Sequence, residues 1–166
     1  MDVFADLAPV ADNYAVLPVG EAFNWSSVAS VIEPGEWYMV AFRSIVRPDA
    51  DQERLRQYDD FAHEEASGAK GFVHYYKGPQ APDRSCLSFC LWNSRAEARE
   101  AAGRPAHQKA VTLIADTYEA YSLEFLRVGK PAGATNLEFE PYDAAPEAGP
   151  ASGPRPASLG FSTAPS

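Results

Sequence analysis

Apolar and polar residues follow a regular period only between residues 36 and 130. The run from Trp37 to Val46 is rich in aromatic and β-branched residues and is followed by a proline, which predicts a first strand. Helical spacing of apolar residues comes next, and Asp49 with Gln52 is typical of a capping box. We therefore expect a helix that starts near Asp49 and ends near Gly68.

A hairpin and a second helix complete this regular part. Gly and Pro residues separate two strand-like runs and predict a turn between them. Ser94 and Glu97 form a second capping-box pair, and the helix that follows is interrupted and restarts at Pro105. The strands predicted after the first helix are Gly71 to Lys77, Cys86 to Trp92 and Tyr121 to Val128. The order βαββαβ predicts an α+β fold, a ferredoxin-like unit with a four-stranded antiparallel sheet.

Both faces of the first strand are apolar. Trp37 and Met39 lie on one face, and Tyr38 and Val40 lie on the other. Two helices can cover only one face of the sheet, so the second face must be buried against something else. The same face of a second copy is the simplest cover, and it predicts a homodimer built as a dimeric α/β barrel.

The chain divides into an N-terminal arm, a central domain and a C-terminal tail, at residues 1–35, 36–130 and 131–166. The arm scatters aromatic residues among prolines, and Asn24 is placed to cap a short helix with Trp25 and Val28 on one side. We expect the arm to pack either on the core or on the dimer mate. The tail is rich in Pro, Gly, Ala and Ser, which predicts flexibility.

Composition and charge narrow the class of protein. The chain has 166 residues, of which 46% are hydrophobic, enough for one domain with a real core. A formal net charge of -9 argues against nucleic acid or an anionic membrane as a partner. We find neither a basic leader nor an apolar run of about 18 residues, and expect a cytoplasmic protein. Cys86 and Cys90 lie too far apart along one strand to form a disulfide.

Three short motifs in the central domain resemble those of a known family. They are Gly71-Phe72 at the start of the second strand, Leu91-Trp92-Asn93-Ser94 between the third strand and the second helix, and Ala106-His107 in that helix. In this order they resemble the antibiotic-biosynthesis-monooxygenase-like family of the dimeric α/β-barrel superfamily. The resemblance implies cofactor-free oxygenation of polycyclic aromatic molecules or degradation of haem, although some members have no known activity.

The haem-degrading members use a histidine of the second helix as iron ligand, with a tryptophan in that helix and an asparagine in the first strand. Ala106-His107 matches the ligand position. The tryptophan position falls near Glu97, and the first strand contains no asparagine. We therefore expect no cofactor, with haem as the alternative. The three histidines lack the spacing of a zinc site, so we expect no metal.

His107 is the histidine that helical spacing places on an apolar stripe. The stripe continues through Val111, Ile114 and Tyr118, so the imidazole should face the sheet. Such a histidine is either a neutral core residue bonded to a carbonyl or tyrosine, or a group that contacts a ligand. His63 lies off the stripe of its own helix and is expected in solvent.

Two further polar positions lie inside predicted strands. His74 alternates with Phe72 and Tyr76, so these three should share one face, either the helix-covered pocket or the dimer seam. Arg43 interrupts an apolar strand, and a buried guanidinium needs an acid such as Glu124 or an anionic ligand.

These residues define the predicted site and function. The substrate-binding candidates beside the catalytic His107 are His74, Tyr76, Trp92, Trp37, Arg43 and Tyr118. We expect a monooxygenase-like enzyme that holds an aromatic or polycyclic molecule between sheet and helices. His107 would remove a proton so that an electron-rich anion reacts with O₂. The alternative is a non-catalytic dimeric ligand-binding or accessory module, favoured by the large share of the chain outside the central domain.

Overall fold

The structure, a computed structural model, describes residues 2 to 144, in which five antiparallel strands form one sheet in the order β2-β3-β1-β4-β5. The strands are β1 (Gly35–Val46), β2 (Phe72–Tyr76), β3 (Ser85–Trp92), β4 (Tyr118–Lys130) and β5 (Glu138–Pro141). The helices are α1 (Val19–Ala22), α2 (Trp25–Ala29), α3 (Gln52–Ser67), α4 (Arg95–Ala102), α5 (Pro105–Thr112) and α6 (Ile114–Thr117), with 3-10 turns η1 (Tyr14–Val16) and η2 (Tyr142–Ala144). No helix among these residues is long and apolar enough to cross a membrane.

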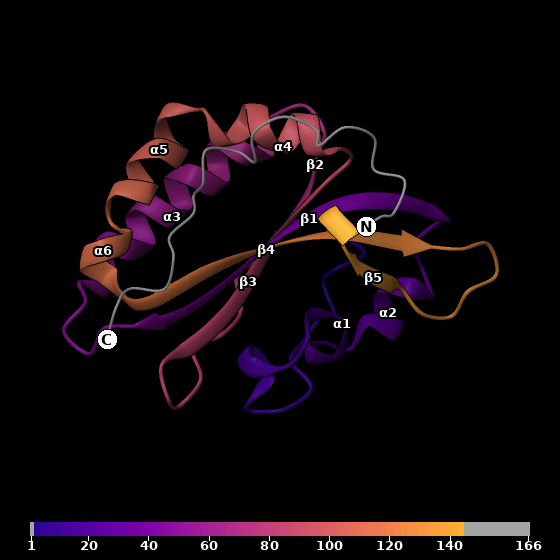
Figure 1. Cartoon of the computed structure of the whole chain (residues 1–166), viewed down its shortest axis with the longest axis horizontal. Coiled ribbons are helices and arrows are strands. Elements are labelled where there is room, and N and C mark those ends of the chain that lie inside the picture. The colour runs from indigo at the N-terminus through magenta and orange to yellow at the C-terminus, as the bar shows by residue number, and fades with distance from the viewer. Residues whose placement is uncertain (1, 145–166) are drawn as a thin grey trace.

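The predicted ferredoxin-like order βαββαβ is confirmed. β1 lies between β3 and β4, and β2 pairs with β3 at the edge of the sheet. Figure 1 shows α3 and α4 to α6 together on one side of the sheet. We call this side the helix face, which carries Tyr38 and Val40 of β1. The opposite side, the arm face, carries Trp37 and Met39, because successive residues of a strand point to opposite faces.

Side-chain caps explain where the main helices begin. Ser94 accepts a hydrogen bond from the Glu97 N–H at 3.3 Å and donates one to the Glu97 carboxylate at 2.8 Å, so this predicted helix start is confirmed. The cap of α3 is Asp51 and not the predicted Asp49. The Asp51 carboxylate accepts a hydrogen bond from the Arg54 N–H at 2.9 Å, because it directly precedes the helix.

The second helical region consists of three helices. α5 begins with Pro105, as predicted, and α6 follows it. The backbone becomes extended at Tyr118, where β4 starts, earlier than the predicted Tyr121. The placement of Tyr118 on the helical stripe of His107 was therefore wrong, since α6 ends before it.

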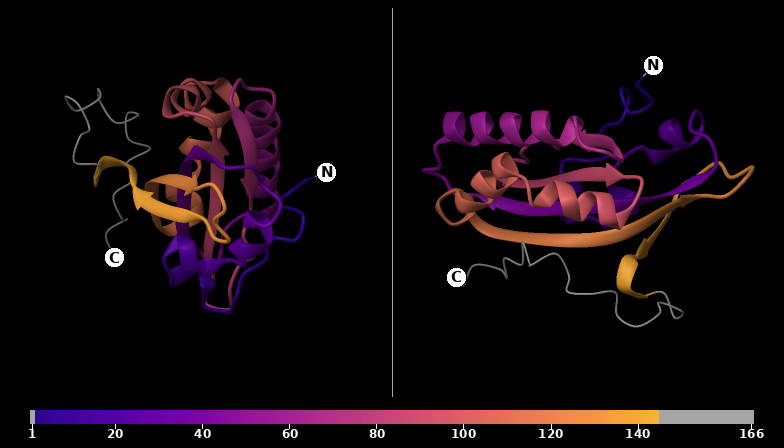
Figure 2. Two further views of the ribbon diagram at one scale, coloured as in Figure 1. Left: turned by 90° about the vertical axis from the view of Figure 1, so that its right-hand side faces the viewer. Right: turned by 90° about the horizontal axis from the view of Figure 1, so that it is seen from above.

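The fifth strand lies in the segment for which the sequence predicted a flexible tail. β5 pairs with β4, with Phe139 opposite Val128, and together with η2 it extends beyond the β4 edge (Figure 2). The Phe139 ring packs on Trp25 of the arm, with ring centroids 5.0 Å apart. This contact ties the segment to the core, which Pro- and Gly-rich composition alone did not reveal. The remaining part of the predicted tail, from residue 145, lies outside the described residues.

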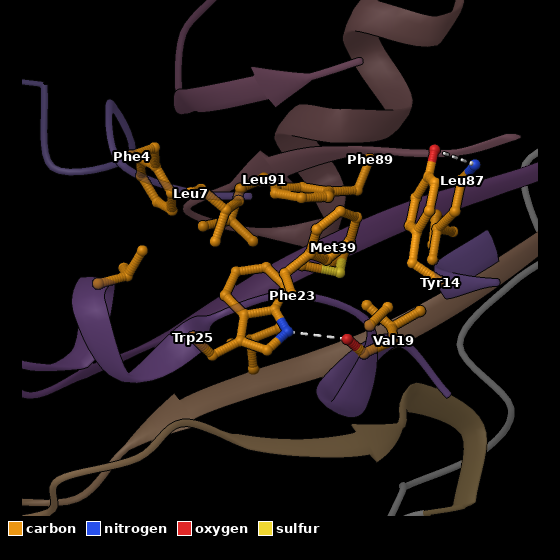
Figure 3. Packing of buried hydrophobic residues seen from close by; sticks show 14 of the residues in the cluster. Phe4, Leu7, Tyr14, Val19, Phe23, Trp25, Met39, Leu87, Phe89 and Leu91 are labelled. Carbon is orange, nitrogen blue, oxygen red and sulfur yellow. Dashed lines mark hydrogen bonds between the residues drawn. The ribbon is translucent and has the colours of Figure 1, made fainter. Parts of the chain in front are cut away.

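The N-terminal arm packs on the chain's own sheet, one of the two predicted alternatives. Figure 1 shows α1 and α2 on the side opposite to α3, and Figure 3 shows their side chains interleaved with those of the arm face. The buried apolar residues include Phe4, Leu7, Tyr14, Phe23, Trp25 and Val28 from the arm, and Met39, Leu87, Phe89 and Leu91 from the sheet. We call this set the arm core.

Hydrogen bonds also fix the arm. The Tyr14 hydroxyl donates to the Pro79 carbonyl at 2.5 Å and accepts from the Leu87 N–H at 3.3 Å, which joins η1 to β3 and the loop before it. The short helix predicted after Asn24 is confirmed as α2. The Asn24 side chain accepts a hydrogen bond from the Ala8 N–H at 2.6 Å instead of capping that helix.

The arm core changes the argument for a homodimer. A second copy was predicted because the second apolar face of the sheet needs cover. The arm supplies that cover from within the chain. This reason for dimerisation therefore does not hold, and the homodimer stays a prediction without it.

Candidate functional site

An aromatic cavity lies between the helix face of the sheet and the helices that cover it. Its volume is about 490 Å³, enough to enclose most of a polycyclic molecule. The wall on the sheet side includes Tyr38, Val40, Phe42, Tyr75, Trp92 and Phe125. The wall on the helix side comes mainly from α3 and α5.

His107 of α5 lies at the wall of this cavity. Its Nε2 atom is buried and has no hydrogen-bond partner among residues 2 to 144. A core histidine of the kind considered from the sequence would bond a carbonyl or tyrosine at this atom. Buried polar atoms are nearly always paired, so an unpaired one beside a cavity is suited to contact a ligand.

Burial lowers the pKa of His107, and the charge of Glu65 opposes this shift. Glu65 extends from α3 to the start of α5, where its carboxylate accepts the backbone N–H of Ala106 at 3.2 Å and of His107 at 3.4 Å. Glu65 thereby caps α5 and positions His107 relative to α3. With its pKa lowered, the imidazole is neutral at pH 7 and can accept a proton.

The lowered pKa of His107 predicts a loss of stability in acid. The folded protein keeps the imidazole neutral, whereas the unfolded chain protonates it near the ordinary pKa of 6.5. The stabilising contribution is complete above that value and is lost as the pH falls through the lower, folded pKa. The free energy of unfolding, measured in urea, falls between about pH 7.5 and 5, and it should fall less in His107→Gln than in the parent. Equal losses in parent and variant would contradict this assignment.

A second polar group lies on the sheet side of the cavity. Tyr75 of β2 donates its hydroxyl hydrogen to Asp59 Oδ1 of α3 at 2.9 Å, and Lys77 Nζ lies 3.0 Å from Asp59 Oδ2. The His63 ring, although its side chain is exposed, packs beside Tyr75 with ring centroids 4.9 Å apart. Burial, with a further contribution from the Asp59 charge, raises the pKa of Tyr75 well above its ordinary value. The Tyr75 hydroxyl is therefore protonated at neutral pH.

Three of the predicted site residues line this cavity: His107, Trp92 and Tyr118. Trp92 is buried at the end of β3 and meets the Phe72 ring edge-on, with centroids 5.4 Å apart. Tyr118 lies at the start of β4, where burial raises the pKa of its hydroxyl. Trp92 lies opposite Tyr38 and Tyr118 lies opposite Val46 of β1, so these two residues mark opposite ends of the cavity wall.

His74 and Tyr76 lie on the arm face, away from the cavity. Their strand partners are Leu91 and Phe89 of the arm core. Phe72 instead pairs with Trp92 on the helix face, because the register of β2 shifts between Phe72 and His74. The prediction that Phe72, His74 and Tyr76 share one face was therefore wrong.

Arg43 and Trp37 also lie on the arm face. Arg43 Nε lies 2.5 Å from Glu124 Oε1, and Arg43 Nη1 donates to the Ala15 carbonyl at 2.7 Å. The acidic partner considered from the sequence is thus present, and the guanidinium joins β4 to the arm. Trp37 is partly buried against the arm core.

Tyr75 and Asp59 were missed by the sequence analysis. Tyr75 follows His74 along the strand, so it lies on the other face, and the sequence left the orientation of β2 undecided. The cavity is lined by Leu55, Asp59 and His63, which follow one another at intervals of four residues on α3. This helical spacing was a usable signal for Asp59.

The cysteines are not activated nucleophiles. Cys90 lies on the helix face, and burial raises the pKa of its thiol. The Cys86 thiol donates a hydrogen bond to the Gly78 carbonyl at 3.1 Å. A reactive cysteine needs a lowered pKa, so the buried Cys90 serves packing, while Cys86 is held by its hydrogen bond to Gly78.

Haem would need both an iron ligand and cationic partners for its carboxylates at the cavity wall. Among residues 2 to 144, no group of three or more His, Cys, Asp or Glu side chains is placed to hold a metal ion. His107 could supply a ligand atom, but the two haem carboxylates would also need cationic partners. The cationic lysine and arginine side chains at the described cavity wall, Arg56, Lys77 and Arg99, each have a partner already.

The fold and the cavity define an α+β protein with a ferredoxin-like sheet and an aromatic pocket beneath its helices. Residues 2 to 141 match the PB2B2.08-like family, and the chain belongs to this family. No protein of curated function matches the sequence.

Several solved structures resemble part of the chain. SnoaB, a cofactor-independent oxygenase from Streptomyces nogalater, is 14% identical over 58% of this chain and 93% of its own, with a TM-score of 0.44. Rv0793 from Mycobacterium tuberculosis is 19% identical over 59% of this chain and 98% of its own, with a TM-score of 0.49. A Nitrosomonas europaea protein, designated a candidate antibiotic biosynthesis monooxygenase, is 12% identical over 62% of this chain and 97% of its own, with a TM-score of 0.48.

Proposed function

We propose that the cavity binds an aromatic or polycyclic small molecule and that His107 acts as the base in its cofactor-free oxygenation. The observation that most supports this proposal is the buried, unpartnered Nε2 atom of His107 at the wall of an aromatic cavity. Trp92 and Tyr118 would close the two ends of the site, and aromatic side chains between them, such as Phe42 and Phe125, would contact the rings of the substrate.

The proposed chemistry follows from a neutral base in an apolar site. A suitable substrate carries a CH₂ group between two aromatic rings that are also joined by a carbonyl group, which takes up the negative charge when the CH₂ group loses a proton. His107 removes a proton from this carbon and leaves a phenolate-like anion that reacts with O₂. A C–O bond forms and gives a peroxide on this carbon, and the O–O bond and the remaining C–H bond then break. The products are a C=O group and water, which takes one hydrogen from that C–H bond and one proton from His107. The substrate supplies all the electrons, so no cofactor is consumed.

His107→Ala is expected to lower the rate of oxygen uptake with anthrone, which has such a CH₂ group, by about a hundredfold, as for loss of a general base. The matched control is His74→Ala, which removes a histidine from the arm face. The spontaneous oxidation of anthrone is measured without protein and subtracted. The melting temperature of each variant is measured alongside the rate.

The two variants separate a catalytic role from a structural one. A normal rate in His107→Ala with a lower melting temperature would show that His107 only fills space. A comparable loss of rate in His74→Ala would show that the arm face, and not the cavity, carries the activity.

The second candidate function is a non-catalytic ligand-binding or accessory module. It is favoured because the carboxylates of Glu65 and Asp59 are both bonded to other groups: Glu65 caps α5, and Asp59 bonds Tyr75 and Lys77. Glu65 therefore bonds the backbone N–H of His107, and no carboxylate among residues 2 to 144 is bonded to its ring, as one commonly is in catalytic histidines. Tight binding of anthrone to the parent protein without oxygen uptake would select this function.

A further inference from the structure

The cluster of Tyr75, Asp59 and Lys77 has no role in the chemistry proposed above. Asp59 uses both carboxylate oxygens, since Oδ1 accepts the Tyr75 hydroxyl at 2.9 Å and Oδ2 lies 3.0 Å from Lys77 Nζ. Asp59 belongs to α3, while Tyr75 and Lys77 lie at the end of β2 and just after it. The cluster therefore connects the two walls of the cavity and holds the Tyr75 oxygen in place.

The direction of the Tyr75 hydrogen bond decides what the cavity offers to a ligand. A tyrosine hydroxyl has one hydrogen and two acceptor lone pairs. The hydrogen points to Asp59 Oδ1, so the Tyr75 oxygen presents only acceptor lone pairs to other groups. The raised pKa of Tyr75 keeps that hydrogen on the oxygen at neutral pH.

The charges at this wall disfavour an anionic ligand. Lys77 is paired with Asp59, and its positive charge is compensated there. The pair therefore offers no net positive charge to a ligand carboxylate, and the Tyr75 oxygen, whose hydrogen points to Asp59, cannot donate to one. An uncharged group with a hydrogen to donate suits this position best, and a hydroxyl is the simplest such group on an aromatic ring.

We propose that Tyr75 is a positioning residue that accepts a hydrogen bond from a hydroxyl group of the aromatic ligand, and that Asp59 sets this polarity. The inference rests on the proposed function, because it takes the cavity to be the ligand site. It narrows the substrate class to uncharged hydroxylated aromatic molecules. Tyr75 contacts the ligand from the sheet, whereas His107 contacts it from α5.

Two ligands, 1-hydroxypyrene and 1-methoxypyrene, test this proposal. Their affinities for the full chain are measured by fluorescence titration at neutral pH. The parent should bind the hydroxyl compound about five- to tenfold more tightly, as expected for one hydrogen bond. Tyr75→Phe should remove this preference by weakening 1-hydroxypyrene alone. Tyr76→Phe, the matched control at the next position of β2, should keep it because Tyr76 lies on the arm face.

Two variants of Asp59 test whether Asp59 makes the Tyr75 hydroxyl an acceptor toward the ligand. Asp59→Ala frees the Tyr75 hydroxyl to donate, so 1-methoxypyrene should gain affinity and the preference should shrink. Asp59→Asn keeps a carbonyl oxygen that can accept from Tyr75 and should retain more of the preference. Melting curves of all variants show whether each one folds.

A preference for 1-hydroxypyrene that survives Tyr75→Phe in a folded protein would overturn the role of Tyr75, while the cavity would remain a site for aromatic molecules. Failure of the parent to bind either compound would overturn both this inference and the proposed function. Loss of the preference in Tyr76→Phe would also overturn the inference, since that side chain does not reach the cavity.

Discussion

Trp25→Ala is expected to lower the free energy of unfolding by about 3 to 5 kcal/mol. The Trp25 side chain is 5% exposed, and its ring packs against Phe23, Phe89 and Phe139 with centroids 5.0 to 5.5 Å apart. Its indole N–H donates to the Val19 carbonyl at 2.8 Å (Figure 3). Truncation would leave a void where the arm, β3 and β5 meet, and would leave the carbonyl without this partner.

Urea unfolding of the parent, Trp25→Ala and Phe61→Ala measures this effect. Phe61 is an aromatic residue of α3 that is 59% exposed, so its truncation should change stability by no more than about 0.5 kcal/mol. Similar small losses in the two variants would contradict the packing of the arm on the sheet. A large loss for Trp25→Ala alone would show that the arm is an integral part of the domain.

Gly78→Ala is expected to cost about 2 to 3 kcal/mol. A methyl group at Gly78 would overlap the Leu87 carbonyl and the Tyr14 hydroxyl. The first is backbone of a central strand, and the second is held by hydrogen bonds to Pro79 and Leu87, so neither can move cheaply. The Gly78 N–H also donates to Ser88 Oγ at 3.2 Å, which fixes the backbone at this point.

Gly129→Ala is the matched control, because a methyl group there meets nothing within 4 Å. It should be neutral or stabilise the fold by up to about 1 kcal/mol, since alanine restricts the unfolded chain. Thermal and urea unfolding of the two variants give the comparison. Equal stability in both would show that Tyr14 does not lie against Gly78.

The two faces of the sheet differ in packing, because one face is filled by side chains and the other borders the cavity. The arm face is filled by the arm core and carries much of the stability. The helix face keeps an open cavity with His107 and Tyr75 at its walls. Substitutions at Trp25 and Gly78 should therefore act on folding, whereas substitutions at His107 and Tyr75 should act on ligand binding or turnover.

The βαββαβ order and the local features that produce it could be predicted from the amino-acid sequence. Residue type and periodicity identify strands and helices because they depend on near neighbours, and the Ser94–Glu97 cap is entirely local. The pairing of Arg43 with Glu124 was also accessible, since a charge inside an apolar strand needs a partner on an adjacent strand. The sequence likewise indicated that His107 faces inward.

The face of the sheet that the β2 side chains occupy, and the segment that covers the arm face, could not be predicted without the tertiary structure. A register shift after Phe72 places Tyr75 in the cavity and His74 outside it, and a shift of one residue reverses the face of every side chain that follows. Covering of the arm face by the arm depends on contacts between residues far apart in the chain, as does the pairing of β5 with β4. Periodicity cannot report such contacts, because it reflects whether a residue is buried and not which partner buries it.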